Sequence, residues 1–247
     1  MTGSQGRQLC DLRVFIMNKT ELMGVSISDL TVRECLSRAS GYLRKGSLDV
    51  IYYISRDTLL AAKDSPELKG LIREADLVLP DSIDILKACG ILSRSREKEI
   101  ERNLFLKSFL KMLSREKSRI FCLADSDEKA DTLMADLRLI QDGLKNEGRY
   151  VAGEDEDPEN IVNEINMVSP EVIFCSFGSP LQERFIAQKK KINAKLMILV
   201  TPGMLDVRED GTINNSGLLN LLRTRLFRRQ AKKYEMDKES VKSDDNP

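Results

Sequence analysis

Short runs of apolar, mostly β-branched residues alternate along this chain with longer segments in which apolar residues recur at helical spacing. Apolar runs bounded by turn residues are typical of buried strands, and the segments between them are typical of amphipathic helices. This repetition predicts an α/β fold, a Rossmann-like and mostly parallel sheet with helices on both faces. The predicted strands are Leu12–Met17, Leu48–Ile54, Asp76–Leu79, Arg119–Ala124, Val172–Ser176 and Lys195–Val200.

Several predicted helices begin with a recognisable capping signal. Thr31 and Glu34 have the spacing of a capping box, in which each side chain accepts a hydrogen bond from a backbone N–H of the other residue. Elsewhere a capping side chain precedes a proline at the first helical position. These pairs are Ser65-Pro66, Asp157-Pro158 and Ser179-Pro180.

The same pattern divides the chain into an α/β domain and a C-terminal extension. Residues 12–215 are predicted to form the domain, residues 216–236 a basic amphipathic helix, and residues 237–247 a disordered tail, because they carry charge without an apolar period. Parallel sheets bind ligands beyond the carboxyl ends of their strands. Functional residues are therefore expected in the loops that follow the strands.

Composition narrows the chemistry that the chain can perform. Its 247 residues have a formal net charge of zero, so any preference for nucleic acid or for an anionic membrane has to be local. The chain contains no histidine, which excludes a Ser-His-Asp triad, a Cys-His pair and histidine-based zinc sites. A general base therefore has to be a carboxylate, a lysine or a tyrosine.

The cysteines and the apolar runs indicate the kind of cellular compartment in which the protein is found. The five cysteines are widely spaced, and Cys122 and Cys175 lie in predicted strands, which favours free thiols in a reducing compartment over a disulfide framework. The run from Leu196 to Val200 is far shorter than the roughly 20 residues of a membrane span. Residues 1–11 are polar, so we expect no targeting segment and a soluble protein body.

Asp81 is the first candidate for chemistry, because it follows the predicted strand that ends at Leu79-Pro80. A carboxylate in a partly desolvated cleft has a raised pKa and becomes a usable base near neutral pH. The alternative is that Asp81 only caps the helix beginning near Ile83, since aspartate is a favoured cap. Local sequence favours the cap.

The segment Ser176-Phe177-Gly178-Ser179-Pro180-Leu181-Gln182-Glu183 is the second candidate. Gly178 permits close approach of the backbone to a ligand, and the predicted helix start at Ser179 favours an anion such as a diphosphate. Gln182 and Glu183 fall in the first turn of that helix. A well-capped turn without a ligand is the alternative.

The third candidate is the basic segment Arg223–Lys233, which contains no acidic residue and is accompanied by leucines and Phe227. A basic helix with an apolar side can lie on an anionic membrane surface. A docking helix with a solvated charged face explains the pattern equally well. Nucleic-acid binding is not expected, because no aromatic stacking platform accompanies the basic residues.

In their order along the chain, these segments resemble the blocks of the WecG/TagA/CpsF glycosyltransferase family. Residues 22–43 resemble the family's opening strand and helix, and residues 70–90, with Ala75-Asp76-Leu77-Val78-Leu79-Pro80-Asp81, resemble its "sadlvlPDG" block. Residues 172–184 resemble "lfvglGsPkQE". Gly203-Met204-Leu205-Asp206, followed by Gly211, resembles "Gg-fD…G". The similarity covers roughly residues 22–234 and identifies the chain as a divergent member.

The resemblance implies an inverting, metal-independent transfer of an N-acetylhexosamine, of the N-acetylmannosamine type, from a UDP-sugar. The acceptor is a polyprenyl-diphosphate-linked sugar of cell-envelope polysaccharide synthesis. It further implies a cytoplasmic protein associated peripherally with the inner face of the plasma membrane. No cofactor or metal is expected, and the oligomeric state, including a homo-oligomer, is left open.

The resemblance also assigns roles to residues. It makes Asp81 the base that takes the acceptor hydroxyl's proton, and it makes Gln182 a donor contact in a block with Gly178, Ser179 and Glu183. Arg225, Arg228 and Arg229 correspond to the family's arginine-rich C-terminal appendage, which covers the site and touches the membrane. The remaining substrate-binding candidates from the matching blocks are Ser55, Arg102 and Asp206.

The chain departs from the family pattern at several of these blocks. Tyr53-Ile54-Ser55 replaces threonine-x-asparagine, Ser82 replaces a glycine, and only Glu101-Arg102 remains of "ERvtG". Ala124-Asp125 replaces a glycine pair and puts a carboxylate near the expected donor phosphates, which is unfavourable unless a cation intervenes. These departures support a second hypothesis, a catalytically silent member that binds a nucleotide sugar or a membrane partner.

Overall fold

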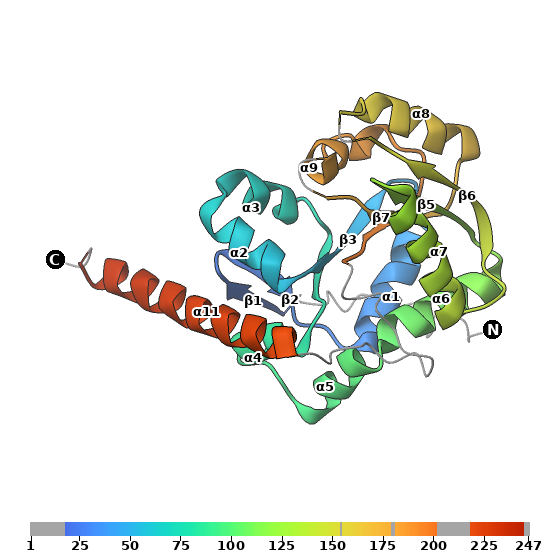
Figure 1. Ribbon diagram of the computed structural model, residues 1–247. Helices are drawn as coiled ribbons and strands as arrows, with labels where there is room; N and C mark the ends of the chain where they lie inside the picture. The colour runs from blue at the N-terminus through green and yellow to red at the C-terminus, as the bar shows by residue number, and fades with distance from the viewer. Residues whose placement is uncertain (1–17, 154, 179–180, 202–217, 245–247) are drawn as a thin grey trace, which may run out of the picture.

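A parallel sheet of six strands, in the order β4-β3-β8-β7-β5-β6, forms the centre of the protein (Figure 1). The computed structural model describes residues 18–153, 155–178, 181–201 and 218–244. Each neighbouring pair in the sheet is parallel. The strands are β3 (Asp49–Ile54), β4 (Leu77–Pro80), β5 (Arg119–Ala124), β6 (Lys145–Val151), β7 (Val172–Ser176) and β8 (Leu196–Leu199). The α/β fold class predicted from the sequence is confirmed.

Helices connect the strands. Their bounds are α1 (Val32–Tyr42), α2 (Arg56–Asp64), α3 (Pro66–Arg73), α4 (Ile83–Ala88), α5 (Arg94–Glu101), α6 (Leu104–Glu116), α7 (Asp127–Ile140), α8 (Pro158–Val168), α9 (Leu181–Ile186), the 3₁₀ turn η1 (Lys189–Lys191) and α11 (Leu218–Asp244). The capping box at Thr31 and Glu34 is confirmed. Ser65 and Asp157 also cap helices that begin with proline, as predicted.

The sheet is covered on both faces, because alternate residues of its buried strands enter different cores. Tyr52 and Leu199 belong to the core that α2, α3, α8 and α9 cover. Tyr53 and Ile198 belong to the core that α1, α6 and α7 cover. A strand buried on both faces reads as a continuous apolar run, which is why five of the six strands were predictable from such runs.

The apolar runs did not predict three of the strands, and the structure shows why. β6 lies at the edge of the sheet, and its sequence KNEGRYV has no buried side chain. β1 (Lys19–Leu22) and β2 (Val25–Ser28) form a short antiparallel hairpin apart from the main sheet. Met23 and Gly24 connect them with φ values of 53° and 76°, a conformation typical of tight hairpin turns. The predicted strand Leu12–Met17 lies outside the described residues.

The C-terminal helix α11 packs against α4 and extends away from the sheet (Figure 1). Its Phe227 and Ala231 are 0% and 4% exposed and join the core that includes Leu22 and Met23 of the hairpin. The basic C-terminal helix is therefore a docked element. It continues to Asp244, past the end predicted at residue 236, so helical structure extends into the segment predicted as a tail.

Two further observations concern the cysteines and membrane spans. The cysteines at 35, 89, 122 and 175 are free, which agrees with the prediction of free thiols. Within the described parts of the chain, no helix has both the length and the apolar character required to cross a membrane.

We expect Phe227→Ala to lower the free energy of unfolding by about 3 kcal/mol, because it removes a large buried side chain and leaves a cavity beside the hairpin. Leu226→Ala is the matched control, since the neighbouring Leu226 is 58% exposed and its loss should change stability by less than about 0.5 kcal/mol. Urea unfolding monitored by circular dichroism measures both. Equal effects of the two substitutions would show that α11 is not anchored through Phe227.

Candidate functional site

Polar residues gather where the parallel strands end. Ser55 follows β3, Asp81 follows β4, Asp125 follows β5, Gly178 lies just after β7, and Thr201 lies just after β8. Because the strands are parallel, all these positions lie at one edge of the sheet, the carboxyl edge. This is where an open α/β sheet binds ligands.

Two hydrogen bonds, to Ile54 in β3 and to Thr201 after β8, hold Asp81 at this edge. Its backbone N–H donates to the Ile54 carbonyl of β3 at 3.1 Å. Its Oδ2 accepts a hydrogen bond from the Thr201 hydroxyl at 3.0 Å. Ser82, not Asp81, occupies the N-cap position of α4, and no side chain caps that helix. The capping alternative for Asp81 is therefore wrong.

The surroundings of Asp81 raise the pKa of its carboxyl group to about 6. Burial is the main cause, because a desolvated carboxylate is costly. The Thr201 hydrogen bond, the nearby Ser82 hydroxyl and the Arg56 charge each oppose the shift in part. The group is thus ionised at neutral pH yet basic enough to accept a proton, as a general base requires.

A cavity of about 50 Å³ opens beside Asp81 on the face of the sheet that α1 and α6 cover. Its walls are mostly apolar and also include two charged residues of α5. The lining residues are Leu30, Val32, Cys35, Tyr53, Leu79, Pro80, Asp81, Arg96, Glu99, Ile100, Asn103 and Phe105.

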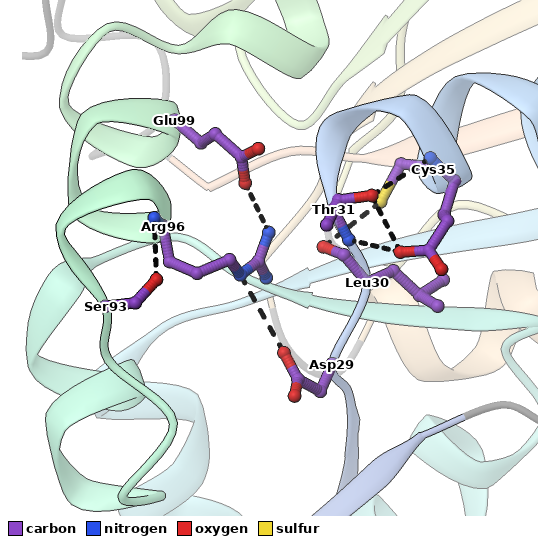
Figure 2. Close-up of polar contacts among 8 residues, drawn as sticks. Asp29, Leu30, Thr31, Cys35, Ser93, Arg96 and Glu99 are labelled. Carbon is purple, nitrogen blue, oxygen red and sulfur yellow. Dashed lines mark hydrogen bonds and ion pairs between the residues drawn. The ribbon is translucent and has the colours of Figure 1, made fainter.

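Arg96 is the only basic residue among those lining residues, and acidic groups hold it (Figure 2). Its Nη1 donates to Glu99 Oε2 at 2.6 Å, and its Nε lies 3.7 Å from Asp29 Oδ1. Figure 2 shows the guanidinium between these carboxylates, opposite the start of α1. Its side chain is 12% exposed. The Cys35 thiol in the same wall stays protonated, because burial raises its pKa to about 12.

A second carboxylate, Asp84 of α4, joins the sheet edge to α11. Asp84 Oδ2 accepts from Arg56 Nη1 at 3.1 Å and from the Thr224 hydroxyl at 2.6 Å, and Oδ1 accepts from Arg228 Nη2 at 2.8 Å. Arg56 also donates to the Thr224 hydroxyl at 2.6 Å. We call these four residues, Arg56, Asp84, Thr224 and Arg228, the Asp84 cluster.

The cluster holds Asp84 ionised. Burial would raise the pKa of its carboxyl group, but the hydrogen bonds from Thr224 and Arg228 and the charges of Arg228 and Arg56 outweigh burial and lower the pKa. Arg228, one of the predicted membrane or acceptor contacts, is therefore fixed beside the site while its side chain stays 48% exposed.

On the other side of the edge, Asp125 holds the loop after β7. Its Oδ2 accepts the backbone N–H of Gly178 at 2.7 Å, and Lys129 of α7 lies 2.7 Å from its Oδ1. A side chain at Gly178 would bring its Cβ to 3.0 Å from the same Oδ2, so a larger residue would fit only if the Asp125 carboxylate shifted slightly. Lys129 supplies the cation that the sequence required for a carboxylate at this position.

Gln182 of α9 donates from Nε2 to the Tyr52 hydroxyl of β3 at 2.6 Å. Tyr52 belongs to the core on the α2 and α9 face, whereas the cavity beside Asp81 lies on the other face. Three strand spacings separate β4 from β7, so Asp81 and Gly178 are about 14 Å apart across the sheet. Only an extended ligand lying along the carboxyl edge can touch both.

The remaining predicted site residues lie as follows. The Ser55 hydroxyl caps α2, accepting the Thr58 N–H at 3.0 Å. Arg102 is exposed at the end of α5, and Arg225 and Arg229 are exposed on α11. Ser179, Asp206 and the side chain of Glu183 lie outside the described residues.

Sequence reasoning missed Arg96, Lys129, Thr201 and Asp84. Thr201 follows a predicted strand, so the rule that led to Asp81 could have found it. Lys129 is four residues after Asp125 on a helix, the spacing of an ion pair. Arg96 lies in a segment of charged residues, and nothing in that pattern distinguishes it from its exposed neighbours. Among the described residues, no cluster of histidine, cysteine and acidic side chains is arranged to hold a metal ion.

Comparison with known proteins agrees with the family resemblance of the sequence. The sequence model of the glycosyl transferase WecG/TagA/CpsF family matches residues 20–207. An N-acetylglucosaminyldiphosphoundecaprenol N-acetyl-beta-D-mannosaminyltransferase of Bacillus subtilis (strain 168) is 22% identical over 171 residues, 67% of this chain and 66% of the relative. A protein of the same name from Bacillus spizizenii (strain ATCC 23059 / NRRL B-14472 / W23) is 21% identical over 146 residues, 59% and 56% of the two chains. The chain thus spans less than two thirds of the length of these curated relatives.

Asp81 makes stability depend on pH. The pKa of its carboxyl group is about 6 in the folded protein and near 3.8 in the unfolded chain. The stability that this group contributes to the folded state is therefore fully present below pH 3.8 and is lost as the pH rises through 6. We expect Asp81→Asn to remove this dependence, making the variant more stable than the natural protein above pH 7 by up to about 3 kcal/mol. Denaturant unfolding of both proteins at pH 4.5 to 8 measures the difference; a difference that does not change with pH would contradict the raised pKa.

Proposed function

Because the chain belongs to the WecG/TagA/CpsF glycosyltransferase family, we propose that it transfers an N-acetylhexosamine of the N-acetylmannosamine type from a UDP-sugar to a polyprenyl-diphosphate-linked acceptor. The product would serve cell-envelope polysaccharide synthesis. The observation that carries the proposal is Asp81, a carboxylate with a raised pKa at the carboxyl edge of the sheet. The names of the two Bacillus relatives support the sugar and the acceptor.

In the proposed reaction the Asp81 carboxylate accepts the proton of the attacking acceptor hydroxyl. The hydroxyl oxygen forms the new bond to the anomeric carbon while the bond from that carbon to the diphosphate breaks. UDP leaves with the electron pair, and attack from the opposite side inverts the anomeric configuration. The Thr201 hydroxyl, bonded to Oδ2, holds the carboxylate in place for this proton transfer.

On the donor side, we assign the loop after β7 and Lys129 to the UDP-sugar. Gly178 permits close approach of a ligand, and Gln182 places an amide at the same edge. Lys129, which pairs with Asp125 and is partly exposed, is a cation beside this loop that we assign to contact the diphosphate. Ser179, Glu183, Ser55, Arg102 and Asp206 remain proposed substrate contacts from the family resemblance.

A catalytically silent member is the second candidate, and one observation favours it. Asp125 already accepts the Gly178 N–H, so a donor phosphate would have to displace a carboxylate to use that amide. Calorimetry with UDP-sugars and a transfer assay on the same preparation separate the two candidates. Binding without turnover supports the silent member, and turnover excludes it.

We also propose that the protein is cytoplasmic and associates with the inner face of the membrane through α11. Arg225 and Arg229 are exposed on this helix, and the Asp84 cluster fixes Arg228 on the same helix beside the site. A lipid-linked diphosphate approaching from an anionic membrane would meet these cations before it reached Asp81.

We expect Asp81→Asn to lower kcat by about 10²- to 10⁴-fold, because an amide cannot take the acceptor's proton. In the natural protein kcat/KM should rise with pH to a plateau above about 6, where Asp81 is ionised. Asp64→Asn is the matched control, since Asp64 is 80% exposed and away from the edge. A radiolabelled transfer assay measures all three proteins, and near-normal transfer by Asp81→Asn would contradict the assignment.

Replacing both Arg225 and Arg229 by glutamine should weaken binding to anionic liposomes by about 30-fold. This follows from roughly 1 kcal/mol for each cation close to an anionic surface. The change keeps Phe227 and Arg228, so α11 stays docked. Arg33→Gln with Arg44→Gln removes the same charge from exposed positions on and after α1 and should leave binding unchanged. Cosedimentation with vesicles containing phosphatidylglycerol gives the comparison; equal losses would indicate bulk charge rather than a surface on α11.

A further inference from the structure

The cavity beside Asp81 is too small for a whole sugar ring. Its volume of about 50 Å³ is the space for the centres of water-sized groups. A buried water needs about 10–15 Å³ of such space, so the cavity holds about four atoms of that size. That is the size of one ring substituent, which would enter while the ring itself stayed at the edge near Asp81.

The walls decide what kind of substituent fits. Leu30, Val32, Ile100 and Phe105 offer contacts for an apolar group. Arg96 offers hydrogen-bond donors, and its Nε is buried with no hydrogen-bond partner among the described residues. A buried N–H without a partner is unfavourable, so a ligand atom that accepted a hydrogen bond from it would relieve that cost.

Charge around Arg96 argues against an anionic substituent. Glu99 already accepts from Arg96 at 2.6 Å, and Asp29 lies 3.7 Å from its Nε. Asp81 adds a further negative charge when it is ionised, so the lining residues together with Asp29 include three carboxyl groups and one guanidinium. A carboxylate entering here would be repelled. An ammonium group would be desolvated against the apolar walls at a larger cost than a neutral group.

We propose that this cavity receives the acetamido group of the N-acetylhexosamine held at Asp81, with the methyl group against the apolar walls and the carbonyl oxygen accepting a hydrogen bond from Arg96. Arg96 is then a specificity-determining residue for N-acetylated sugars. The assignment rests on the proposed function, and it adds the residues that distinguish an acetamido sugar from a plain hexose.

Paired substrates that differ only in the acetamido group provide the test. One pair consists of lipid-diphosphate acceptors that carry N-acetylglucosamine or glucose, and the other of UDP-N-acetylmannosamine and UDP-mannose as donors. The natural protein should prefer the N-acetylated member by about 10- to 100-fold in kcat/KM within one of these pairs. The pair that shows the preference identifies the sugar that occupies the cavity.

Arg96→Met should lower kcat/KM for the N-acetylated member by about 10- to 100-fold and leave the plain hexose within about 3-fold. Val32→Phe, which fills the cavity from α1 and retains Arg96, should abolish the same preference. Arg94→Met removes an exposed arginine from the same helix and is the matched control. Thermal unfolding followed by circular dichroism confirms that each variant is folded.

A preference that survives both Arg96→Met and Val32→Phe, or no preference in either pair, would overturn the assignment of the cavity. Failure of the proposed function has a different result, since then no pair of substrates is turned over. In that case titration with N-acetylglucosamine 1-phosphate and with glucose 1-phosphate, followed by calorimetry, still tests the cavity. Tighter binding of the N-acetylated sugar that Arg96→Met removes supports it, and equal binding of the two sugars overturns it.

Discussion

The sheet is buried on both faces, and this constraint determines where the chain can place polar chemistry. Residues such as Tyr52 and Tyr53 alternate between the two cores, so a charged side chain within a central strand would be desolvated without a partner. Polar groups are tolerated again where the strands end. Asp81, Thr201 and Asp125 stand at those ends. The carboxyl edge is therefore both the permitted place for charge and the place where a ligand can reach it.

The helix α11 depends on the same edge. Apolar packing of Phe227 and Ala231 holds it against the hairpin, while the Asp84 cluster sets its position beside the end of β3. Ion pairs that are largely removed from water contribute geometry more reliably than net stability. Burial of Phe227 thus attaches the helix, and the contacts of Asp84 with Thr224 and Arg228 define which basic side chain lies nearest to the site.

The fold and the site differ in how far the sequence could predict them. Strand positions followed from apolar runs where the strands are buried on both faces, and β6 escaped because none of its side chains is buried. Asp81 was found because it follows a strand, but its bond to Thr201 joins residues 120 positions apart, and no local pattern encodes that distance. Arg96 could not be found, because Glu99 is its neighbour on the same helix, whereas Asp29 approaches it from a distant part of the chain that no local pattern reveals.

Asp81 and Asp84 are three residues apart, yet their surroundings shift their pKa values in opposite directions. Arg56, Thr224 and Arg228 concentrate on Asp84, which stays ionised and binds α11. At Asp81 the hydroxyls of Thr201 and Ser82 and the Arg56 charge offset burial only in part, so burial prevails and its pKa rises to about 6. If Arg56 paired with Asp81 instead, the carboxylate would lose its basicity. The cluster that docks the C-terminal helix therefore also engages Arg56, whose charge offsets burial at Asp81 only in part, which makes docking and basicity parts of one arrangement.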